Sequence, residues 1–194
     1  MSISPSFAQQ LNALISTQRL ALEPINSSHA ISLFDLMQDT AIYQWISTKP
    51  PKNIELLAQW WAQRESRLGP SGNEAWLNWA VRRTSDGAYV GKLDAEVDAT
   101  GVATNVGYLF FPKYWGQGYA SESVAAMTDH LAMLGIYKMV ATVTSGNTSS
   151  YRVLEKAGFI RTRVIPDNDT IRGVKFDDVE YVRMIVTVQP DSMA

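Results

Sequence analysis

Three consecutive segments with a two-residue hydrophobic period, followed directly by a helical period, constrain the fold of this chain most. Residues 76–83, 89–97 and 102–111 alternate apolar and polar side chains, and short dipeptides ending in glycine separate them. Such dipeptides are typical of tight turns between antiparallel strands. In residues 118–134 the apolar side chains fall on one helical stripe, which ends before a glycine. The pattern predicts an antiparallel meander that leads directly into a helix.

The other segments complete a mixed sheet covered by helices. A strand is expected near residues 20–25, and two helices follow it, the second capped near Asn53. After the helix at 118–134 the pattern predicts a strand at 138–144, a helix at 147–157, a strand at 159–165, a polar loop at 166–173 and a last strand at 179–188. We therefore expect one α/β (mixed α+β) domain, with a central, largely antiparallel sheet of about seven strands flanked by four helices.

Composition excludes several kinds of chemistry. The 194 residues include no cysteine and only two histidines, His29 and His130. Disulfides, thiolate zinc sites, iron–sulfur clusters, a thioester on the protein and a histidine-rich metal site are therefore excluded. The formal net charge of −2 argues against a broad binding surface for nucleic acid. Residues 1–10 have neither a basic segment nor a long apolar run, so we expect no secretion signal, no membrane span and a cytoplasmic location.

The segment between the third meander strand and the following helix fits a phosphate group. It reads P-K-Y-W-G-Q-G-Y-A at 112–120, so Gly116 and Gly118 open a helix directly after a strand. Glycine lets backbone N–H groups approach a ligand, and the helix N-terminus adds partial positive charge, so diphosphate is the expected guest. The alternative is a turn that only requires two glycines. A dinucleotide fingerprint is excluded because Ser121 replaces its third glycine, and no Walker motif is present.

A second motif, after the glycine loop, narrows the interpretation of the first. Residues 147–159 read N-T-S-S-Y-R-V-L-E-K-A-G-F, after a predicted helix and strand. The two motifs together resemble the GNAT N-acetyltransferase family, in particular its Rim-type branch, which acetylates the N-termini of ribosomal proteins. Residues 19–22 and 90–92 also look like this branch, and the resemblance extends over 19–188. It implies an acetyltransferase domain at 19–188, an N-terminal extension at 1–18 and a C-terminal tail at 189–194.

The resemblance also implies the cofactor and how it is held. Members transfer acetyl from acetyl-CoA to an amine by direct attack, without an acyl-enzyme and without a metal. Backbone amides of the glycine loop would bind the pyrophosphate, and the preceding strand would border the pantetheine arm. Each assignment has a structural alternative: a helix-opening Asn is ordinarily a cap, and the two Phe residues also fit one strand's core and surface. The residues so assigned are Leu109, Phe110, Phe111, Gly116, Gln117, Gly118, Tyr119, Ala120, Ser121 and Asn147.

The catalytic hydroxyl implied by the resemblance is Ser150. The wider family often has a tyrosine general acid where this chain has Leu154, whereas the Rim-type branch has a serine three residues after the motif's asparagine. We interpret Ser150 as a hydrogen-bond donor to the departing thiolate sulfur, with the adjacent Tyr151 as the alternative. A thiol pKa of about 8.5 means that this leaving group needs little more help.

The sequence leaves the general base open. Many relatives have a glutamate where this chain has Asn105, which does not usefully accept a proton. Glu96 shares a strand face with Asp94, and Asp169 lies about where the branch has an acidic residue. An α-amine with a pKa of about 7.7–8.0 is partly neutral at physiological pH, so water can relay its proton. A lysine amine near about 10.4 would demand more of a base.

Three functions follow, from two classes. The leading hypothesis is an acetyl-CoA-dependent N-acetyltransferase that acts on a protein or peptide N-terminal amine, possibly of a ribosomal protein. The second keeps the enzyme but changes the acceptor to a small amine such as a polyamine, an amino acid or an antibiotic. The third is an acyl-CoA-binding module without catalysis, which Asn105 and Leu154 leave open. No direct nucleic-acid or membrane partner is expected, and an exposed last strand would allow a homodimer.

Overall fold

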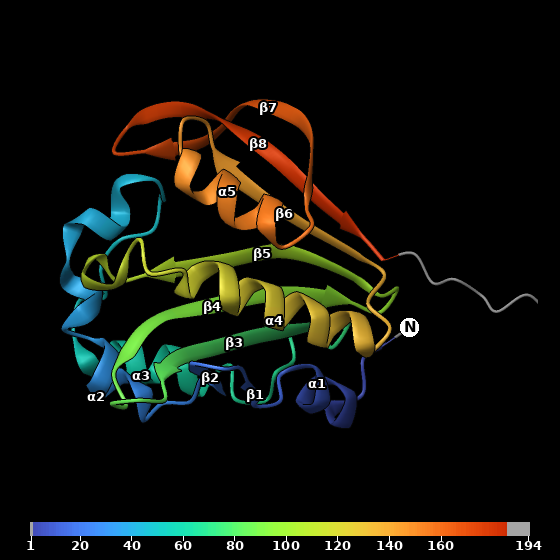
Figure 1. Cartoon of the computed structure of the whole chain (residues 1–194). Coiled ribbons are helices and arrows are strands. Elements are labelled where there is room, and N and C mark those ends of the chain that lie inside the picture. The colour runs from blue at the N-terminus through green and yellow to red at the C-terminus, as the bar shows by residue number, and fades with distance from the viewer. Residues whose placement is uncertain (1, 186–194) are drawn as a thin grey trace, which may run out of the picture.

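The computed structural model describes residues 2–185, which form one eight-stranded sheet with α4 and α5 lying against one face (Figure 1). The strands are β1 (Ile15–Ser16), β2 (Leu20–Pro24), β3 (Glu74–Arg83), β4 (Tyr89–Asp98), β5 (Val102–Phe110), β6 (Lys138–Thr144), β7 (Ile160–Ile171) and β8 (Val174–Met184). The helices are α1 (Pro5–Leu11), α2 (His29–Leu33), α3 (Ile54–Ala62), α4 (Tyr119–Met133) and α5 (Thr148–Lys156), with 3-10 turns η1 (Leu36–Gln38), η2 (Thr40–Gln44) and η3 (Pro112–Tyr114).

The predicted fold class is confirmed, with small differences in the number of elements. The sheet has eight strands rather than about seven, because Ile15–Ser16 adds a short edge strand paired with β2. Residues 2–185 contain five α-helices rather than four, because the apolar residues near the N-terminus form α1. The meander β3–β4–β5 is antiparallel throughout, as its turn dipeptides predicted.

The strand order β1-β2-β3-β4-β5-β6-β8-β7 contains a single parallel neighbour pair, β5 and β6. These two strands pair only at Val102 with Lys138 and at Ala103 with Met139. Figure 1 shows them meeting at one end and diverging toward the other, so that the sheet opens in a V. The divergence leaves the backbone of β5 unpaired on one side beyond Ala103, beside α4 and α5.

The C-terminal hairpin differs from the sequence prediction. Residues 166–173 were expected as a polar loop, but β7 continues to Ile171 and β8 begins at Val174. The connection is only Arg172-Gly173, and both residues have positive φ, 51° and 82°. Two such residues form the primed two-residue turn that suits the twist of antiparallel strands. The polar composition of this segment reflects exposed strand residues, not a loop.

The expected first helix is also interrupted. Its predicted apolar face, Ala30 to Met37, is divided between α2 and η1. The Met37 carbonyl accepts a hydrogen bond from the buried Tyr43 hydroxyl (2.8 Å), which replaces a helical partner. As a result the segment through η2 lies across the open side of the V (Figure 1).

The N-terminal segment is joined to the sheet by specific polar contacts. The Asn12 side chain donates to the Asn78 carbonyl (3.1 Å) and accepts from the Asn78 N–H (3.2 Å), and Trp79 Nε1 donates to the Ala13 carbonyl (2.9 Å). Leu11 is fully buried. The division into residues 1–18 and 19–188 stays a prediction, and the expected tail at 189–194 lies outside the described residues.

Candidate active site

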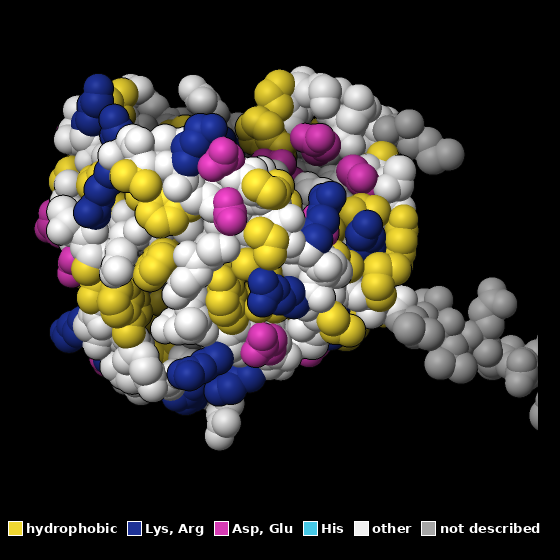
Figure 2. Space-filling model, turned by 90° about the horizontal axis from the view of Figure 1, so that it is seen from above, with side chains coloured by type: hydrophobic (Ala, Val, Ile, Leu, Met, Phe, Trp, Pro, Cys, Tyr) yellow, Lys and Arg dark blue, Asp and Glu magenta, His cyan; other side chains and the backbone are white. Residues whose placement is uncertain are grey.

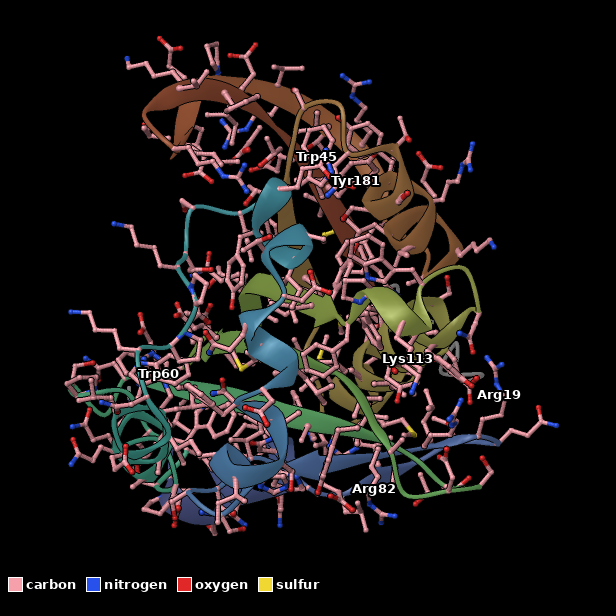
Figure 3. All side chains as sticks on the ribbon, turned by 90° about the vertical axis from the view of Figure 1, so that its left-hand side faces the viewer. Arg19, Trp45, Trp60, Arg82, Lys113 and Tyr181 are labelled. Carbon is pink, nitrogen blue, oxygen red and sulfur yellow. The ribbon has the colours of Figure 1, made fainter. Side chains whose placement is uncertain are left out.

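A cavity of about 1110 Å³ lies where β5 and β6 diverge. It is lined by both strands, by the N-terminal ends of α4 and α5, by α3 and by the η2 segment. In Figure 3, which faces the open side of the V, Trp45 lies at the end of η2 and Trp60 lies on α3, at the other side of the opening. The predicted glycine loop and the predicted catalytic serine therefore share one cavity.

The glycine loop has the conformation that the sequence predicted. Gly116 and Gly118 have φ of 73° and 82°, a left-handed conformation that side chains disfavour. Gly118 is also the N-cap of α4, where no side chain satisfies the first N–H groups of the helix. These free amides and the helix dipole form a cradle for an anion, so the residues present fit a diphosphate. Gly116, Gly118, Tyr119, Ala120 and Ser121 line the cavity.

Gln117 serves the loop in a different way. It is not among the cavity-lining residues. Its side chain donates to the Lys113 carbonyl (3.1 Å), and its own carbonyl accepts from Arg19 Nη1 (3.1 Å). Arg19 and Lys113 lie beside the start of α4 in Figure 3. These contacts hold the turn in shape from outside the cavity.

Glu122, in the first turn of α4, holds Arg19 in place. Its Oε1 accepts from Thr17 Oγ1 (2.6 Å) and from the Arg19 N–H (3.1 Å), and its Oε2 accepts from Arg19 Nε (2.7 Å). Burial opposes the charge of Glu122, but the hydrogen bonds from Thr17 and Arg19 outweigh it and lower the pKa of this carboxyl. The Arg19–Glu122 pair thus ties the start of β2 to the glycine loop.

Ser150 is positioned by the cap of its own helix and by β5. Asn147 Oδ1 accepts the Ser150 N–H (3.2 Å), as expected for an N-cap. Ser150 Oγ lies 2.6 Å from the Tyr108 hydroxyl, which is also 3.1 Å from the Ser150 carbonyl. Burial raises the pKa of Tyr108 well above its usual value, although the bond to Ser150 lowers it slightly, so the phenol keeps its proton at neutral pH.

Tyr108 was not predicted from the sequence. Its only sequence signal is a place on β5 in a two-residue period, which does not distinguish it from a core residue. It contacts Ser150 because β5 and α5 meet at the V, a relation between residues 42 positions apart.

The other residues assigned to the cofactor divide into two groups. Leu109, Phe110 and Asn147 line the cavity, whereas Phe111 does not. The Phe111 N–H donates to the Val90 carbonyl (3.0 Å) and its side chain is buried, so it belongs to the core. The Phe110 carbonyl accepts a hydrogen bond from Trp115 Nε1 (2.6 Å). Trp115 therefore fixes the loop against the end of β5.

A bulge in β5 lies opposite the carboxylates of β4, Asp94 and Glu96. The β4–β5 register shifts between Asp94 and Glu96, and Asn105 adopts a positive φ of 52°. Asn105 Nδ2 donates to Glu96 Oε2 (2.8 Å), and Glu96 lies outside the cavity lining. Asp94 does line the cavity, paired with Lys92 Nζ at 2.5 Å. It lies so close to Gly107 that a Cβ there would be 2.5 Å from Asp94 Oδ2.

Asp169, the other candidate base, lies on β7 and lines the cavity. Asp178, which the sequence analysis did not single out, lines it from β8. The predicted carboxylates are therefore placed differently, with Asp169 at the cavity and Glu96 away from it.

A family model described as "Acetyltransferase (GNAT) domain" matches residues 19–160, well over half of the chain. The chain belongs to the GNAT acetyltransferase family. It is therefore an acetyl-CoA-dependent N-acetyltransferase, as the sequence motifs predicted.

Individual relatives agree with this assignment. The chain is 31% identical over 155 residues to the uncharacterized protein YkkB of Bacillus subtilis, covering 77% of this chain and 86% of that protein. It is 22% identical over 170 residues to the uncharacterized N-acetyltransferase YoaA of the same organism, covering 87% and 94%. A solved structure of RimL, a ribosomal-protein alpha-N-acetyltransferase in complex with coenzyme A, has the same fold (TM-score 0.78, 22% identity, 89% and 98% covered).

Three further properties of the described residues concern a metal site, a membrane-spanning helix and a basic surface. Between residues 2 and 185, no three His, Cys, Asp or Glu side chains lie close enough together to hold a metal ion. No helix in that range has the length and apolar character to cross a membrane. On the face seen in Figure 2, Lys and Arg side chains are interspersed with Asp and Glu, so this face has no extended basic patch for nucleic acid.

Proposed function

We propose that this enzyme acetylates the α-amine of a protein or peptide N-terminus. The observation that carries the proposal is that one open cavity contains both the anion cradle of α4 and the Tyr108–Ser150 pair. Residues of α3 and the η2 segment line the cavity, and in this proposal the chain end enters between them. The fold likeness to RimL, whose described acceptor is an N-terminal α-amine, supports this choice of acceptor.

In this proposal the cofactor follows the V of the sheet. The amides of Gly116, Gly118, Tyr119, Ala120 and Ser121 bind the pyrophosphate, with Gln117 shaping the loop. The unpaired side of β5 at Leu109 and Phe110 borders the pantetheine arm in the manner of an added strand. Phe111 contributes only through the core, and Asn147 both caps α5 and borders the arm.

Ser150 is proposed to stabilise the leaving group. When bound, acetyl-CoA supplies the acetyl group, and the acceptor amine attacks it directly. In this proposal the Tyr108 hydroxyl donates a hydrogen bond to Ser150 Oγ, which leaves the Ser150 hydroxyl proton free to point to the thioester sulfur. A fixed hydroxyl of this kind stabilises the charge that develops as the thiolate departs.

A strong dedicated base is not required for an α-amine. Its pKa of about 7.7–8.0 leaves part of the acceptor neutral at physiological pH. Asp169 lies at the cavity and is the better placed of the two predicted carboxylates, directly or through water. Glu96, bound by Asn105, is proposed only to stabilise the β5 bulge.

A thermal-shift titration and a thiol-release assay test the proposal together. Acetyl-CoA at about 100 times its Kd should add about 2.7 kcal/mol of stability, a Tm increase of about 5–10 °C. Thiol release should follow with peptides that have a free N-terminus and be absent with the same peptides after N-terminal blocking. Release with polyamines, amino acids or aminoglycosides alone would favour the small-amine alternative. Stabilisation without any thiol release would favour a binding module.

A further inference from the structure

Asp178 lies on the face of the sheet that is turned away from α5. It pairs with Thr144 of β6, and residues directly opposite in an antiparallel pair share a face. Thr144 Oγ1 donates to the Trp45 carbonyl (3.1 Å), so the η2 segment covers this face. Tyr181, three residues further on and therefore on the other face, contacts Tyr151 of α5 with ring centroids 5.7 Å apart. Asp178 thus faces the η2 segment, the side from which the proposed acceptor enters.

The hydrogen bonding of Asp178 is incomplete. The residue is only 6% exposed. Its Oδ2 accepts from Asn168 Nδ2 (2.8 Å), whereas Oδ1 is buried and has no hydrogen-bond partner among residues 2–185. No Lys, Arg or His of that range forms an ion pair with it. A buried carboxylate oxygen without a partner is costly, so it marks a place where a ligand supplies the missing donor.

A bulge in β7 fixes the orientation of this carboxylate. Ile165 lies opposite Asp178, and Asp169 lies opposite Phe176. Between these two pairs β7 advances by four residues and β8 by only two, so β7 contains two extra residues. The extra residues include Asp167, with a φ of 51°, and Asn168, whose amide reaches Asp178. Bulges of this kind re-aim side chains next to active sites. The Asn168–Asp178 bond holds one oxygen and leaves the other for a ligand.

The chemistry of the cavity identifies that ligand as a cation. Asp178 and Asp169 line the same cavity as Ser150. The third lining carboxylate, Asp94, already has Lys92 as its cation, whereas Asp178 has none in the described chain. We propose that Asp178 binds the ammonium form of the acceptor amine, so that the enzyme selects acceptors by this positive charge. The bound ammonium then gives one proton to Asp169, directly or through water, before the neutral nitrogen attacks the thioester. This inference rests on the proposed function and adds the group that recognises the acceptor.

Binding to the enzyme saturated with CoA tests this without acetyl transfer. The first probes are tetrapeptide amides in which the first residue is each of the twenty amino acids in turn. The second probe is the desamino analogue of the tightest-binding peptide, in which hydrogen replaces the N-terminal ammonium group. The wild type should bind the ammonium peptide at least about tenfold more tightly. Asp178→Asn should reduce that preference to less than about threefold with unchanged affinity for CoA. Asp177→Asn, an exposed neighbour on the same strand, is the matched control and should behave as wild type.

Stability separates a binding role from a structural one. Asn at position 178 keeps the shape and removes an unpaired buried charge, so Asp178→Asn should retain the wild-type Tm or raise it by about 2–4 °C. A Tm lower by more than about 4 °C would assign Asp178 a structural role and overturn the inference. Asn168→Ala leaves the Asp178 carboxylate in place but removes the hydrogen bond that orients it. This variant should therefore weaken the preference for the ammonium peptide only partly.

The possible failures are distinguishable. No ammonium preference in the wild type, or a preference that survives in Asp178→Asn, overturns the role of Asp178 while thiol release with N-terminal peptides still supports the proposed function. No thiol release with any amine contradicts the proposed function, whatever the binding data show.

Discussion

The hydroxyl oxygen of Tyr108 lies 2.6 Å from Oγ of Ser150 and joins the C-terminal part of β5 to the first turn of α5. The two elements come from opposite sides of the V, so this bond crosses the sheet opening. Burial keeps Tyr108 protonated, so its hydroxyl can donate this hydrogen bond to Ser150 Oγ. The Ser150 hydroxyl proton is then free to turn toward the cavity. The pair is thus arranged to present a hydroxyl to the cavity.

Replacing Tyr108 by phenylalanine should lower kcat by about tenfold, because the loss of one oriented hydrogen bond is worth about 1–1.5 kcal/mol. The KM for acetyl-CoA should change little, since the pyrophosphate cradle is untouched. Steady-state kinetics, which give kcat and KM separately, test this expectation. Tyr137→Phe, an exposed tyrosine, is the control and should be silent. An unchanged kcat would show that Tyr108 does not orient Ser150.

Ser150→Ala should lower kcat further, by about a hundredfold, because it removes the donor to the departing sulfur itself. Its affinity for acetyl-CoA, measured by the thermal-shift titration, should stay within about threefold of wild type. If Ser150 and Tyr108 act as one unit, the double variant should be no slower than Ser150→Ala alone. A decrease in kcat of the double variant equal to the product of the two single decreases would contradict that coupling.

Gly118→Ala should weaken acetyl-CoA binding. The position has a φ of 82°, and its Cβ would lie 3.4 Å from Arg19 Nη2, so the change strains the cradle by about 1–2 kcal/mol. Gly173→Ala is a matched control, because Gly173 has the same φ of 82° in the β7–β8 turn with open space around it. Both variants should lose stability, but only Gly118→Ala should raise the Kd for acetyl-CoA.

Glu122→Gln should destabilise the protein in a pH-dependent way. The pKa of Glu122 is lowered by its hydrogen bonds in the folded state, so its charge stabilises the fold at pH above the ordinary value of about 4.3. That contribution is lost as the pH falls through the lowered pKa. The Tm difference between wild type and variant should therefore be largest near pH 7 and shrink below about pH 4. A difference that is constant with pH would contradict an electrostatic role for the pair with Arg19.

The parts of the fold that depend on local pattern were predictable from the sequence. The meander, the glycine loop and the cap at Asn147 are signalled by residues close together in the chain, and the structure has each of them. The C-terminal hairpin was predicted wrongly, because the exposed polar residues of β7 resemble a loop and the positive φ of Arg172 has no sequence signal.

The pairing of distant side chains was not predictable in the same way. Tyr108 with Ser150, and Asn168 with Asp178, meet because of strand register and a bulge. A single sequence does not give register between strands that are far apart or the position of a bulge without glycine. Glu96 and Asp94 share one face of β4 as counted, but the bulge at Asn105 brings an amide to Glu96, and only Asp94 lines the cavity.

The position of the acetyl group on a product peptide tests the central claim most directly. A peptide with a free N-terminus and one internal lysine would be incubated with the enzyme and acetyl-CoA, and the modified nitrogen located by fragmentation mass spectrometry. We expect a single acetyl group, on the α-nitrogen. Acetylation of the lysine ε-nitrogen, or of no peptide in a panel that varies the first residue, would contradict it.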